Sequence, residues 1–178
     1  MEAARRSTLF SQVAVYEPGV SIAGSIPMGW VPRYRELLAA GDRRGAFACF
    51  VKGIGAAPAP VRMMPTWYLR LVLRLVVPQE RWRRMEPLLE AGAAEHEQEA
   101  RLDDGTADRY RSIRARVLLL GGSKSSVSLT TELFRALRQV IPDSTVEILD
   151  GLDHFAPDEK APALVAERVE RFLRASGG

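Results

Sequence analysis

The chain has 178 residues, of which 47% are hydrophobic, and its 25 basic residues are nearly balanced by 22 acidic ones to give a net charge of +3. This length and apolar content are typical of an ordinary globular domain with a core, and they argue against disorder. No block of five or six like charges occurs, and the densest basic stretch, residues 81–84, is short. Because a nucleic-acid-binding protein needs a basic stripe within a recognisable module, we expect no nucleic-acid partner.

Several features of the sequence indicate a cytoplasmic protein. Cys49 is the only cysteine, so an intramolecular disulfide is impossible. Residues 1–6 lack the apolar core of a secretory signal. The most apolar stretch, residues 69–77, is interrupted by Arg70 and Arg74 and is too short to span a bilayer. We therefore expect no membrane partner, and the sequence does not indicate an oligomeric state.

Three short runs predict buried parallel strands: residues 13–16, 117–120 and 146–149. The first two are continuously apolar, as strands covered on both faces tend to be. The third alternates between polar and apolar residues, which favours a position nearer the edge of a sheet. Each run is followed by residues that form loops, among them glycine, proline and serine.

Helical patterns follow the second and third of these runs. Between them, residues 128–140 carry leucines four positions apart, at Leu129, Leu133 and Leu137. After the third run, residues 162–174 have a proline suited to the first turn and an apolar stripe. An alternation of strand, helix, strand and helix predicts an α/β domain with a parallel sheet.

About 95 residues separate the first two predicted strands, and they contain helical patterns without strand alternation or repeats. The helical candidates are residues 34–40, 42–52, 65–77 and 79–96, and Asp42 is a candidate cap for the second. An all-helical insertion of this size predicts a cap or lid. We therefore expect a first part of the core at 1–22, a helical cap at 23–112 and the rest of the core at 113–178.

The beginning of the chain resembles the end of a helix whose start is missing. Residues 2–6 have a helix-forming composition but no capping residue before them. Three parallel strands also form a poor sheet by themselves, because the strand at 13–16 would have a bare edge. Both features predict a truncated chain that begins partway through a domain.

His154 is the strongest candidate for chemistry. It stands on a glycine-containing loop directly after the predicted strand at 146–149 and before the last helix. In open α/β sheets, ligands and catalytic groups gather beyond the carboxyl ends of the strands. A histidine with an ordinary pKa of about 6.5 can exchange protons near neutral pH, which makes it a candidate general base.

The order of these segments resembles the C-terminal portion of the α/β-hydrolase superfamily. The resemblance rests on residues 11–18, 116–122, 146–149 and 151–154. In that family a strand–helix–strand unit ends with the histidine of the catalytic triad, and the closing helix carries an aromatic–aliphatic pair, here Phe172 and Leu173. The strand at 13–16 resembles the one that follows the nucleophile helix. The resemblance implies a partial α/β-hydrolase fold: three parallel strands, flanking helices and an inserted helical cap.

The resemblance also implies a nucleophile, a histidine base and a carboxylate. The histidine corresponds to His154. Many family members carry the acid near the position of Ser125, but no carboxylate follows here until Glu132. Some members, haloalkane dehalogenases among them, place the acid just after the preceding strand, where this chain has Glu17. Glu17 could instead cap a loop or pair with a cap arginine, and Asp153 is expected to stabilise its loop.

No nucleophile corresponds to the family motif Gly-x-Ser-x-Gly, which is absent from the sequence. The Gly-Ser pairs at 24–25 and 122–123 lack the second glycine. If residues 2–6 are the tail of the nucleophile helix, the motif belongs roughly ten residues before Met1. Cys49 lies in an apolar helical stretch and is expected to be a packing residue.

An apolar cluster in the helical segment could line a substrate entrance, or it could form the core of the cap itself. Its members are Trp30, Met63, Met64, Trp67 and Tyr68. If they line an entrance, the substrate is small and hydrophobic. His96 is expected to be exposed on a helix. Because the two histidines are far apart and no cluster has ligand spacing, we expect neither a metal nor another cofactor.

These features favour a hydrolase of the α/β-hydrolase family, acting on an ester, thioester, amide or carbon–halogen bond through a covalent intermediate. His154 would be the general base and Glu17 its partner, with the nucleophile supplied by residues outside the chain. The alternative is a non-catalytic remnant of such an enzyme, serving as a small-molecule binding module. Both hypotheses require the same fold.

Overall fold

The computed structural model describes residues 1–54, 57, 59–125 and 128–175. The chain forms two compact units. The core unit consists of residues 1–22 together with 104–178, and the helical unit consists of residues 23–103. Residues 104–112, expected from the sequence to belong to the cap, lie in the core unit, where Ala107 and Tyr110 pack in the hydrophobic core.

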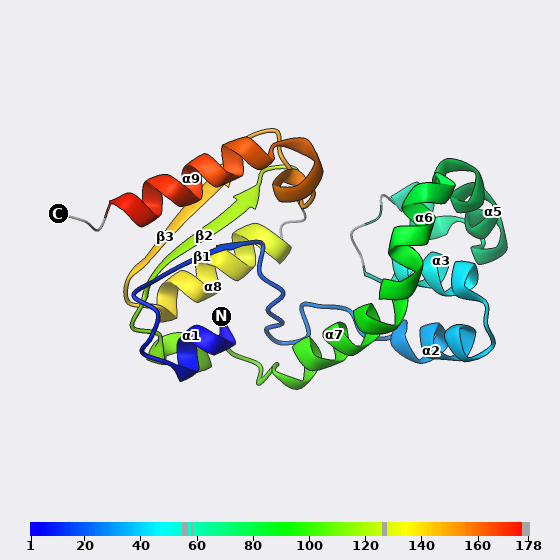
Figure 1. Cartoon of the computed structure of the whole chain (residues 1–178). Helices are drawn as coiled ribbons and strands as arrows, with labels where there is room; N and C mark the ends of the chain where they lie inside the picture. The colour runs from blue at the N-terminus through cyan, green and yellow to red at the C-terminus, as the bar shows by residue number, and fades with distance from the viewer. Residues whose placement is uncertain (55–56, 58, 126–127, 176–178) are drawn as a thin grey trace. The chain divides into compact units, whose positions relative to one another are not determined.

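The core unit is built on a three-stranded parallel sheet (Figure 1). The strands are β1 (Gln12–Tyr16), β2 (Arg116–Gly122) and β3 (Ser144–Leu149), in the order β1-β2-β3. Tyr16 lies opposite Leu120, and Gly122 lies opposite Leu149. The carboxyl ends of all three strands therefore meet at one edge. The prediction of three parallel strands is confirmed, as is the edge position of the third.

Helices cover both faces of this sheet. Along β2, Val117 and Leu119 point to one face and pack with α8 (Leu133–Val140), whereas Leu118 and Leu120 point to the other. That second face packs against α9 (Pro162–Arg174), which lies on the opposite side of the sheet from α8 (Figure 1). This layered arrangement explains why β2 is apolar at every position from Val117 to Leu120.

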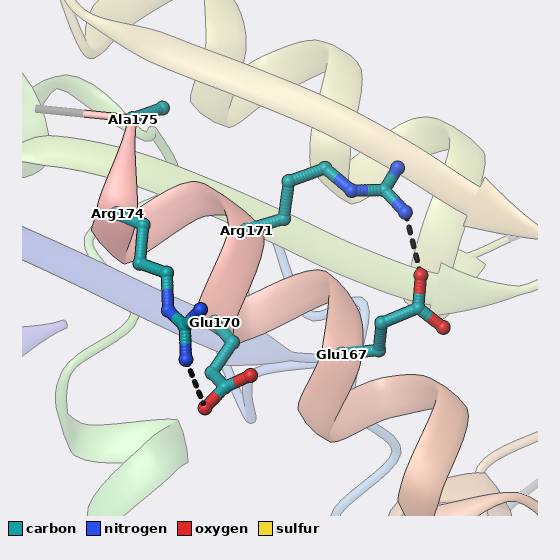
Figure 2. Close-up of a pocket in the computed structure, with 5 residues that line it drawn as sticks. All are labelled: Glu167, Glu170, Arg171, Arg174 and Ala175. Carbon is teal, nitrogen blue, oxygen red and sulfur yellow. Dashed lines mark hydrogen bonds and ion pairs between the residues drawn. The ribbon is translucent and has the colours of Figure 1, made fainter.

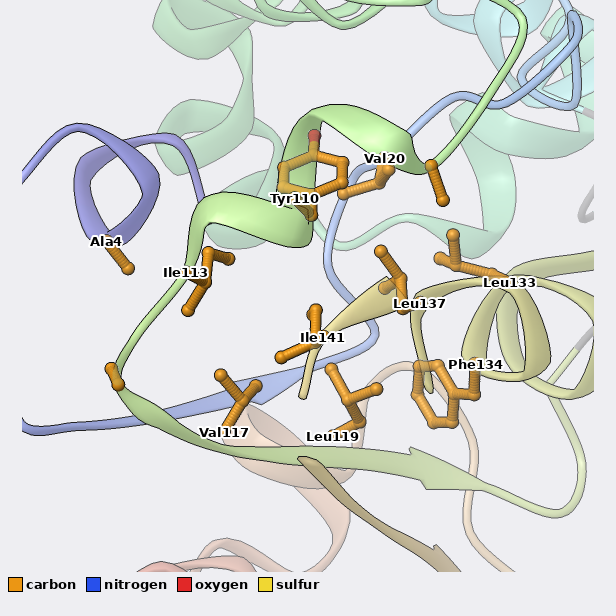
Figure 3. Packing of buried hydrophobic residues seen from close by; sticks show 12 residues of the cluster. Ala4, Val20, Tyr110, Ile113, Val117, Leu119, Leu133, Phe134, Leu137 and Ile141 are labelled. Carbon is orange, nitrogen blue, oxygen red and sulfur yellow. The ribbon is translucent and has the colours of Figure 1, made fainter. Parts of the chain in front are cut away.

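The larger of the two clusters lies on the α8 side (Figure 3). Its buried members are Ala4, Val20, Ala107, Tyr110, Ile113, Ala115, Val117, Leu119, Leu133, Phe134, Leu137 and Ile141. They come from α1 (Glu2–Arg6), the short helix η2 (Asp108–Ser112), β2, α8 and the loops beside these elements. Two turns of π-helix, η3 (Ser128–Glu132) and η4 (Ala156–Lys160), complete the unit. The helix expected at 128–140 thus begins with η3 and continues as α8.

The described residues of the helical unit contain helices and loops but no strand. The helices are α2 (Val31–Ala39), α3 (Arg43–Gly53), α4 (Ala59–Met63), α5 (Thr66–Val76), α6 (Gln79–Met85), η1 (Glu86–Leu88) and α7 (Leu89–Arg101). The single helix expected at 79–96 is wrong, because it divides at η1. Pro87 lies there, and a proline has no N–H for the helical hydrogen-bond ladder.

A compact aromatic cluster forms the core of the helical unit. Trp30, Tyr34 and Trp82 are its largest buried members, joined by Leu89. The Tyr34 hydroxyl donates to the carbonyl oxygen of Leu89 at 2.5 Å, so the polar end of this buried ring is satisfied. Asp42 caps α3, accepting a hydrogen bond from the Gly45 amide at 3.0 Å, as the sequence predicted.

We expect Gly92→Ala to stabilise the helical unit by about 0.5–1 kcal/mol, because glycine costs that much in a helix interior. Gly92 lies within α7, and a Cβ there would meet no heavy atom within 4 Å. At Gly53, by contrast, a Cβ would lie 2.1 Å from Cγ of Trp30, so Gly53→Ala should destabilise the unit. Urea denaturation measures both variants, and shifts of the same sign would contradict this packing.

Candidate functional site

The carboxyl edge of the sheet brings Glu17 and His154 together. Glu17 follows the last residue of β1, and its amide continues the ladder by donating to the carbonyl oxygen of Leu120 at 2.8 Å. His154 lies on the loop that follows β3. Because β1 and β3 run parallel on either side of β2, the segments that leave them start from the same edge. Two residues 137 positions apart thus become neighbours.

Three groups bind the Glu17 carboxylate. Its Oε2 lies 3.0 Å from Nδ1 of His154, and its Oε1 accepts from the Gly122 amide at 2.8 Å and from the Ser125 hydroxyl at 2.5 Å. The Glu17 side chain is 0% exposed, whereas that of His154 is 63% exposed. The buried carboxylate therefore holds the ring through Nδ1, and the other ring nitrogen of this exposed side chain is Nε2.

The surroundings of Glu17 keep its carboxyl group ionised. Burial by itself raises the pKa of Glu17, but the hydrogen bonds from His154, Ser125 and Gly122 lower it further than burial raises it. The pKa of Glu17 in the folded chain therefore lies below its ordinary value of 4.5. At neutral pH the group is a carboxylate, which accepts a hydrogen bond from Nδ1 of His154 when that nitrogen bears a proton.

The same contact favours the charged form of His154. The hydrogen bond to Glu17 raises the pKa of His154, burial opposes it, and the negative charges of Glu17 and Asp153 add to the rise. The pKa of His154 thus lies above its ordinary value of 6.5. Stabilising the imidazolium is what a carboxylate partner contributes when a histidine accepts a proton during catalysis.

We expect this pair to stabilise the core unit most between pH 4.5 and pH 6.5, the ordinary pKa values of Glu17 and His154. The raised pKa of His154 gives stability that is complete below 6.5 and lost as the pH rises through the folded-state pKa. The lowered pKa of Glu17 gives stability that is present above 4.5 and lost as the pH falls through its folded-state pKa. Urea midpoints of the wild type and His154→Gln should differ most in this window. A difference independent of pH would contradict the pairing.

One contact from β1 and two local contacts hold the histidine loop. The Tyr16 hydroxyl donates to the Asp153 carbonyl oxygen at 2.8 Å. Burial, together with nearby negative charge, raises the pKa of Tyr16 to about 12, so the hydroxyl keeps its proton. The Asp153 carboxylate accepts from the Phe155 amide at 3.0 Å and pairs with Lys160. Asp153 therefore has the contacts of a loop-stabilising residue, as the sequence suggested, and fixes the backbone on either side of His154.

Gly122 permits a close approach between the backbone of β2 and that of the loop that carries His154. A Cβ at this position would lie 2.2 Å from the carbonyl oxygen of Leu152, which accepts a hydrogen bond from the Lys124 amide at 2.8 Å. The next residue, Ser123, accepts from the Gly151 amide at 2.8 Å through its hydroxyl. The Gly-Ser pair at 122–123 thus joins β2 to the histidine loop, a role that its sequence did not reveal.

The backbone of Glu17 adopts an unusual conformation. Its φ is 41°, in the left-handed region that residues other than glycine, asparagine and aspartate rarely occupy. Such strain persists where the surroundings over-determine it, often at functional sites. Here the side chain accepts three hydrogen bonds that glycine could not accept, which gives a physical reason for a glutamate at this position.

The five residues expected at a substrate entrance have different surroundings. Trp30 is buried in the core of the helical unit. Met63, Trp67 and Tyr68 are exposed on α4 and α5, and Met64 is half-buried with its carbonyl oxygen accepting from Lys52 at 2.7 Å. Trp30 thus has the core role that the sequence analysis left open, whereas the three exposed residues form part of a surface.

The expected exposure of His96 is wrong. Its ring is half-buried and packs edge-on against Trp30, with centroids 5.3 Å apart, and against Phe50 at 5.7 Å. The contact with these rings arises from the fold of the helical unit and has no local sequence signal. Cys49 is half-buried against the same cluster, and burial raises the pKa of its thiol. Its surroundings are those of a packing residue.

Within residues 1–54, 57, 59–125 and 128–175, no three His, Cys, Asp or Glu side chains come together as metal ligands. Over the same residues, no helix is both long enough and apolar enough to pass through a bilayer.

One surface hollow, of about 460 Å³, lies on the C-terminal turns of α9 (Figure 2). Its lining consists of Glu167, Glu170, Arg171, Arg174 and Ala175. Two ion pairs along the helix occupy it, Arg171–Glu167 at 2.6 Å and Arg174–Glu170 at 3.2 Å (Figure 2). His154 precedes the other end of this helix, so the hollow is separate from the Glu17–His154 pair.

Comparisons with known proteins agree with this architecture. No protein-family model and no curated protein matches the chain. Among solved structures, an alpha/beta hydrolase from Sphaerobacter thermophilus DSM 20745 is similar, with 25% identity and a TM-score of 0.61 over 93% of this chain. The structure of VinJ is similar in fold, with 15% identity and a TM-score of 0.55 over 97% of this chain. This chain spans 61% of the first of these structures and 60% of the second. It has a partial α/β-hydrolase fold.

Proposed function

We propose that the chain carries the acid–base part of a hydrolase site, with His154 as general base and Glu17 as the carboxylate that orients it. The nucleophile comes from residues outside these 178. The reaction is hydrolysis of an ester or a related bond in a small hydrophobic molecule, through a covalent intermediate. The observation that carries the proposal is the buried Glu17 carboxylate bonded to Nδ1 of an exposed His154.

The arrangement has the parts that a histidine base requires. The Glu17 carboxylate selects the tautomer that bears its proton on Nδ1, leaving Nε2 free to take a proton from a nucleophile. The charge on Glu17 then stabilises the imidazolium that forms, in agreement with the raised pKa of His154. Ser125 and the Gly122 amide keep the carboxylate in place, so the base is preorganised before substrate binds.

Two observations support a nucleophile from elsewhere. The sequence has no Gly-x-Ser-x-Gly motif, the elbow on which hydrolases of this fold carry their serine. Within the described part of the chain, β1 pairs with β2 alone, and its other edge faces no strand. That edge can pair with a further strand contributed by additional polypeptide. The carboxyl end of such a parallel strand would lie at the same edge of the sheet as Glu17.

A second candidate is a non-catalytic binding module with the same fold. The absence of the nucleophile motif from the sequence is equally compatible with this candidate. In such a module the Glu17–His154 pair would stabilise the loop and contact a ligand, without proton transfer to a reacting atom.

An extension of the chain distinguishes the two candidates. The 178-residue chain and a version extended in frame upstream of Met1 are assayed with p-nitrophenyl esters. We expect no burst from the short chain and turnover from an extended chain that contains Gly-x-Ser-x-Gly. His154→Gln in the extended chain should lower turnover by about 10²–10⁴-fold, the contribution of a general base.

His96→Gln is the matched control, because it removes the other histidine and should leave turnover in place. An upstream frame without the motif would favour the binding module. So would an extended chain that contains the motif but shows no turnover dependent on His154.

A further inference from the structure

Helix α5 presents an apolar stripe to solvent. Trp67, Leu71 and Leu75 recur every four residues, so their side chains share one side of the helix. All three are exposed, and Trp67 reaches 70%. The opposite side of the helix carries Leu69, which is buried in the helical unit. This element therefore has two apolar faces, and only one of them is covered by the helical unit itself.

Neighbouring residues enlarge the stripe. Tyr68 packs edge-on against Trp67, with ring centroids 5.7 Å apart, and is itself partly exposed. Val76 at the end of α5 and Met63 at the end of α4 are also exposed. Scattered exposed apolar residues are ordinary, but a cluster of this kind on one short segment marks an interaction surface.

The charged residues of the segment that contains α4 and α5 are all basic. From residue 43 to residue 79 the sequence contains no Asp or Glu but six basic residues, among them Arg62, Arg70 and Arg74. Arg70 and Arg74 are four residues apart and follow a row adjacent to the apolar stripe. Arg70 pairs with Asp42 at 2.7 Å. In the part of the chain that the structure describes, no acidic group pairs with Arg62 or Arg74.

This charge disfavours a second copy of the chain as the occupant. If two α5 helices packed stripe to stripe, they would bring their arginine rows together, and like charges across an interface are costly. The segment itself offers no carboxylate to offset them. An anionic surface with an apolar interior would bury the apolar stripe and attract the positively charged arginines.

We propose that α5 docks on an anionic lipid surface, with Leu71 and Leu75 inserted at the level of the acyl chains. Trp67 then lies at the boundary between acyl chains and headgroups, and Arg74 lies at the headgroups. Helices with an apolar face that includes tryptophan, flanked by arginine, bind membrane interfaces in this way. Tryptophan and tyrosine favour the boundary between headgroups and acyl chains. The proposal concerns peripheral contact and not a membrane span, and it goes beyond the proposed hydrolase function.

Vesicle flotation and tryptophan fluorescence test this proposal without any enzymatic assay. The 178-residue chain is mixed with phosphatidylglycerol–phosphatidylcholine vesicles and with pure phosphatidylcholine vesicles. We expect stronger binding to the anionic vesicles, weakened by added salt. Trp67 is the natural reporter, because Trp30 and Trp82 are only 7% and 5% exposed. Emission should shift to the blue on binding, and Trp67→Phe should abolish the shift.

Matched variants test whether vesicle binding depends on the stripe of α5 or on exposed apolar residues in general. Leu71→Glu with Leu75→Glu should weaken binding by about tenfold or more, the effect of removing a buried leucine. Leu88→Glu alters an exposed leucine outside α5 and should leave binding unchanged. Arg74→Gln should weaken binding to anionic vesicles by about fivefold, whereas Arg114→Gln in the core unit should not.

Three results would overturn the proposal. The first is equal binding by the wild type and the double glutamate variant. The second is a concentration-dependent dimer that the double variant abolishes, since a second copy would then cover the stripe. The third is Trp67 emission that is already blue and protected from acrylamide without lipid, because the protein itself would then bury this face.

Discussion

Replacing Glu17 with alanine is expected to lower the free energy of unfolding by about 2–3 kcal/mol, as measured by urea denaturation near neutral pH. The change removes the acceptor of the buried Gly122 amide, of the Ser125 hydroxyl and of the His154 ring. A buried donor that loses its partner costs most of its desolvation energy, and hydrogen bonds to a charged acceptor are stronger than neutral ones. This residue therefore links β1, β2 and the histidine loop.

Two further substitutions at this position separate the stability that comes from the side-chain hydrogen bonds from the cost of the unusual backbone conformation. Glu17→Gly should be about 1 kcal/mol more stable than Glu17→Ala, because glycine adopts the φ of 41° without strain. Glu17→Gln should retain more stability than either, since its amide oxygen can still accept from Gly122 and Ser125. If all three variants were as stable as the wild type, the carboxylate would not be the link that we describe.

Gly122→Ala is expected to destabilise the core unit by about 3 kcal/mol, at the upper end of the usual cost of overpacking. The added Cβ would lie 2.2 Å from the Leu152 carbonyl oxygen, which is backbone and cannot rotate away. The histidine loop must therefore move, and the contact between His154 and Glu17 should lengthen or break. Urea denaturation measures the loss of stability, and a fall in the pKa of His154 reports the lost contact.

Gly121→Ala provides the matched control on the same strand. There a Cβ would meet side-chain atoms of Phe134 and Thr130 at 3.0 Å, and side chains can shift by a few tenths of an ångström. We expect a smaller loss of stability and an unchanged pKa of His154. If Gly121→Ala and Gly122→Ala had equal effects, the close approach to Leu152 would not be the cause.

The sequence predicted the parts of the fold that depend on local pattern. Continuous apolar runs predicted β1 and β2, and the predicted burial on both faces holds for β2, whereas the residues of β1, at the edge of the sheet, are only partly buried. The order of strands and helices then predicted that the residues after β1 and β3 would lie at one edge of the sheet. The proximity of Glu17 and His154 follows from that order, and the structure gives their separation.

Other features could not be predicted, because they depend on contacts between distant residues. Many proteins of the resembling family carry the acid near the position of Ser125, so the sequence suggested only that an acid is missing there. In the structure the Ser125 hydroxyl donates a hydrogen bond to the Glu17 carboxylate. The burial of His96 results from packing against Trp30 and Phe50. The break near Pro87, by contrast, has a local cause and could have been predicted, because a proline has no N–H for the helical hydrogen-bond ladder.

The titration of His154, followed by the NMR signal of its ring proton, tests the central claim most directly. With only two histidines in the chain, His154→Gln assigns the signal. We predict a midpoint above the ordinary value of 6.5 in the wild type and a lower midpoint in Glu17→Gln, because the contact with Glu17 raises the pKa of His154. The same midpoint in both proteins, or a wild-type midpoint below 6.5, would contradict a histidine oriented and charged by Glu17.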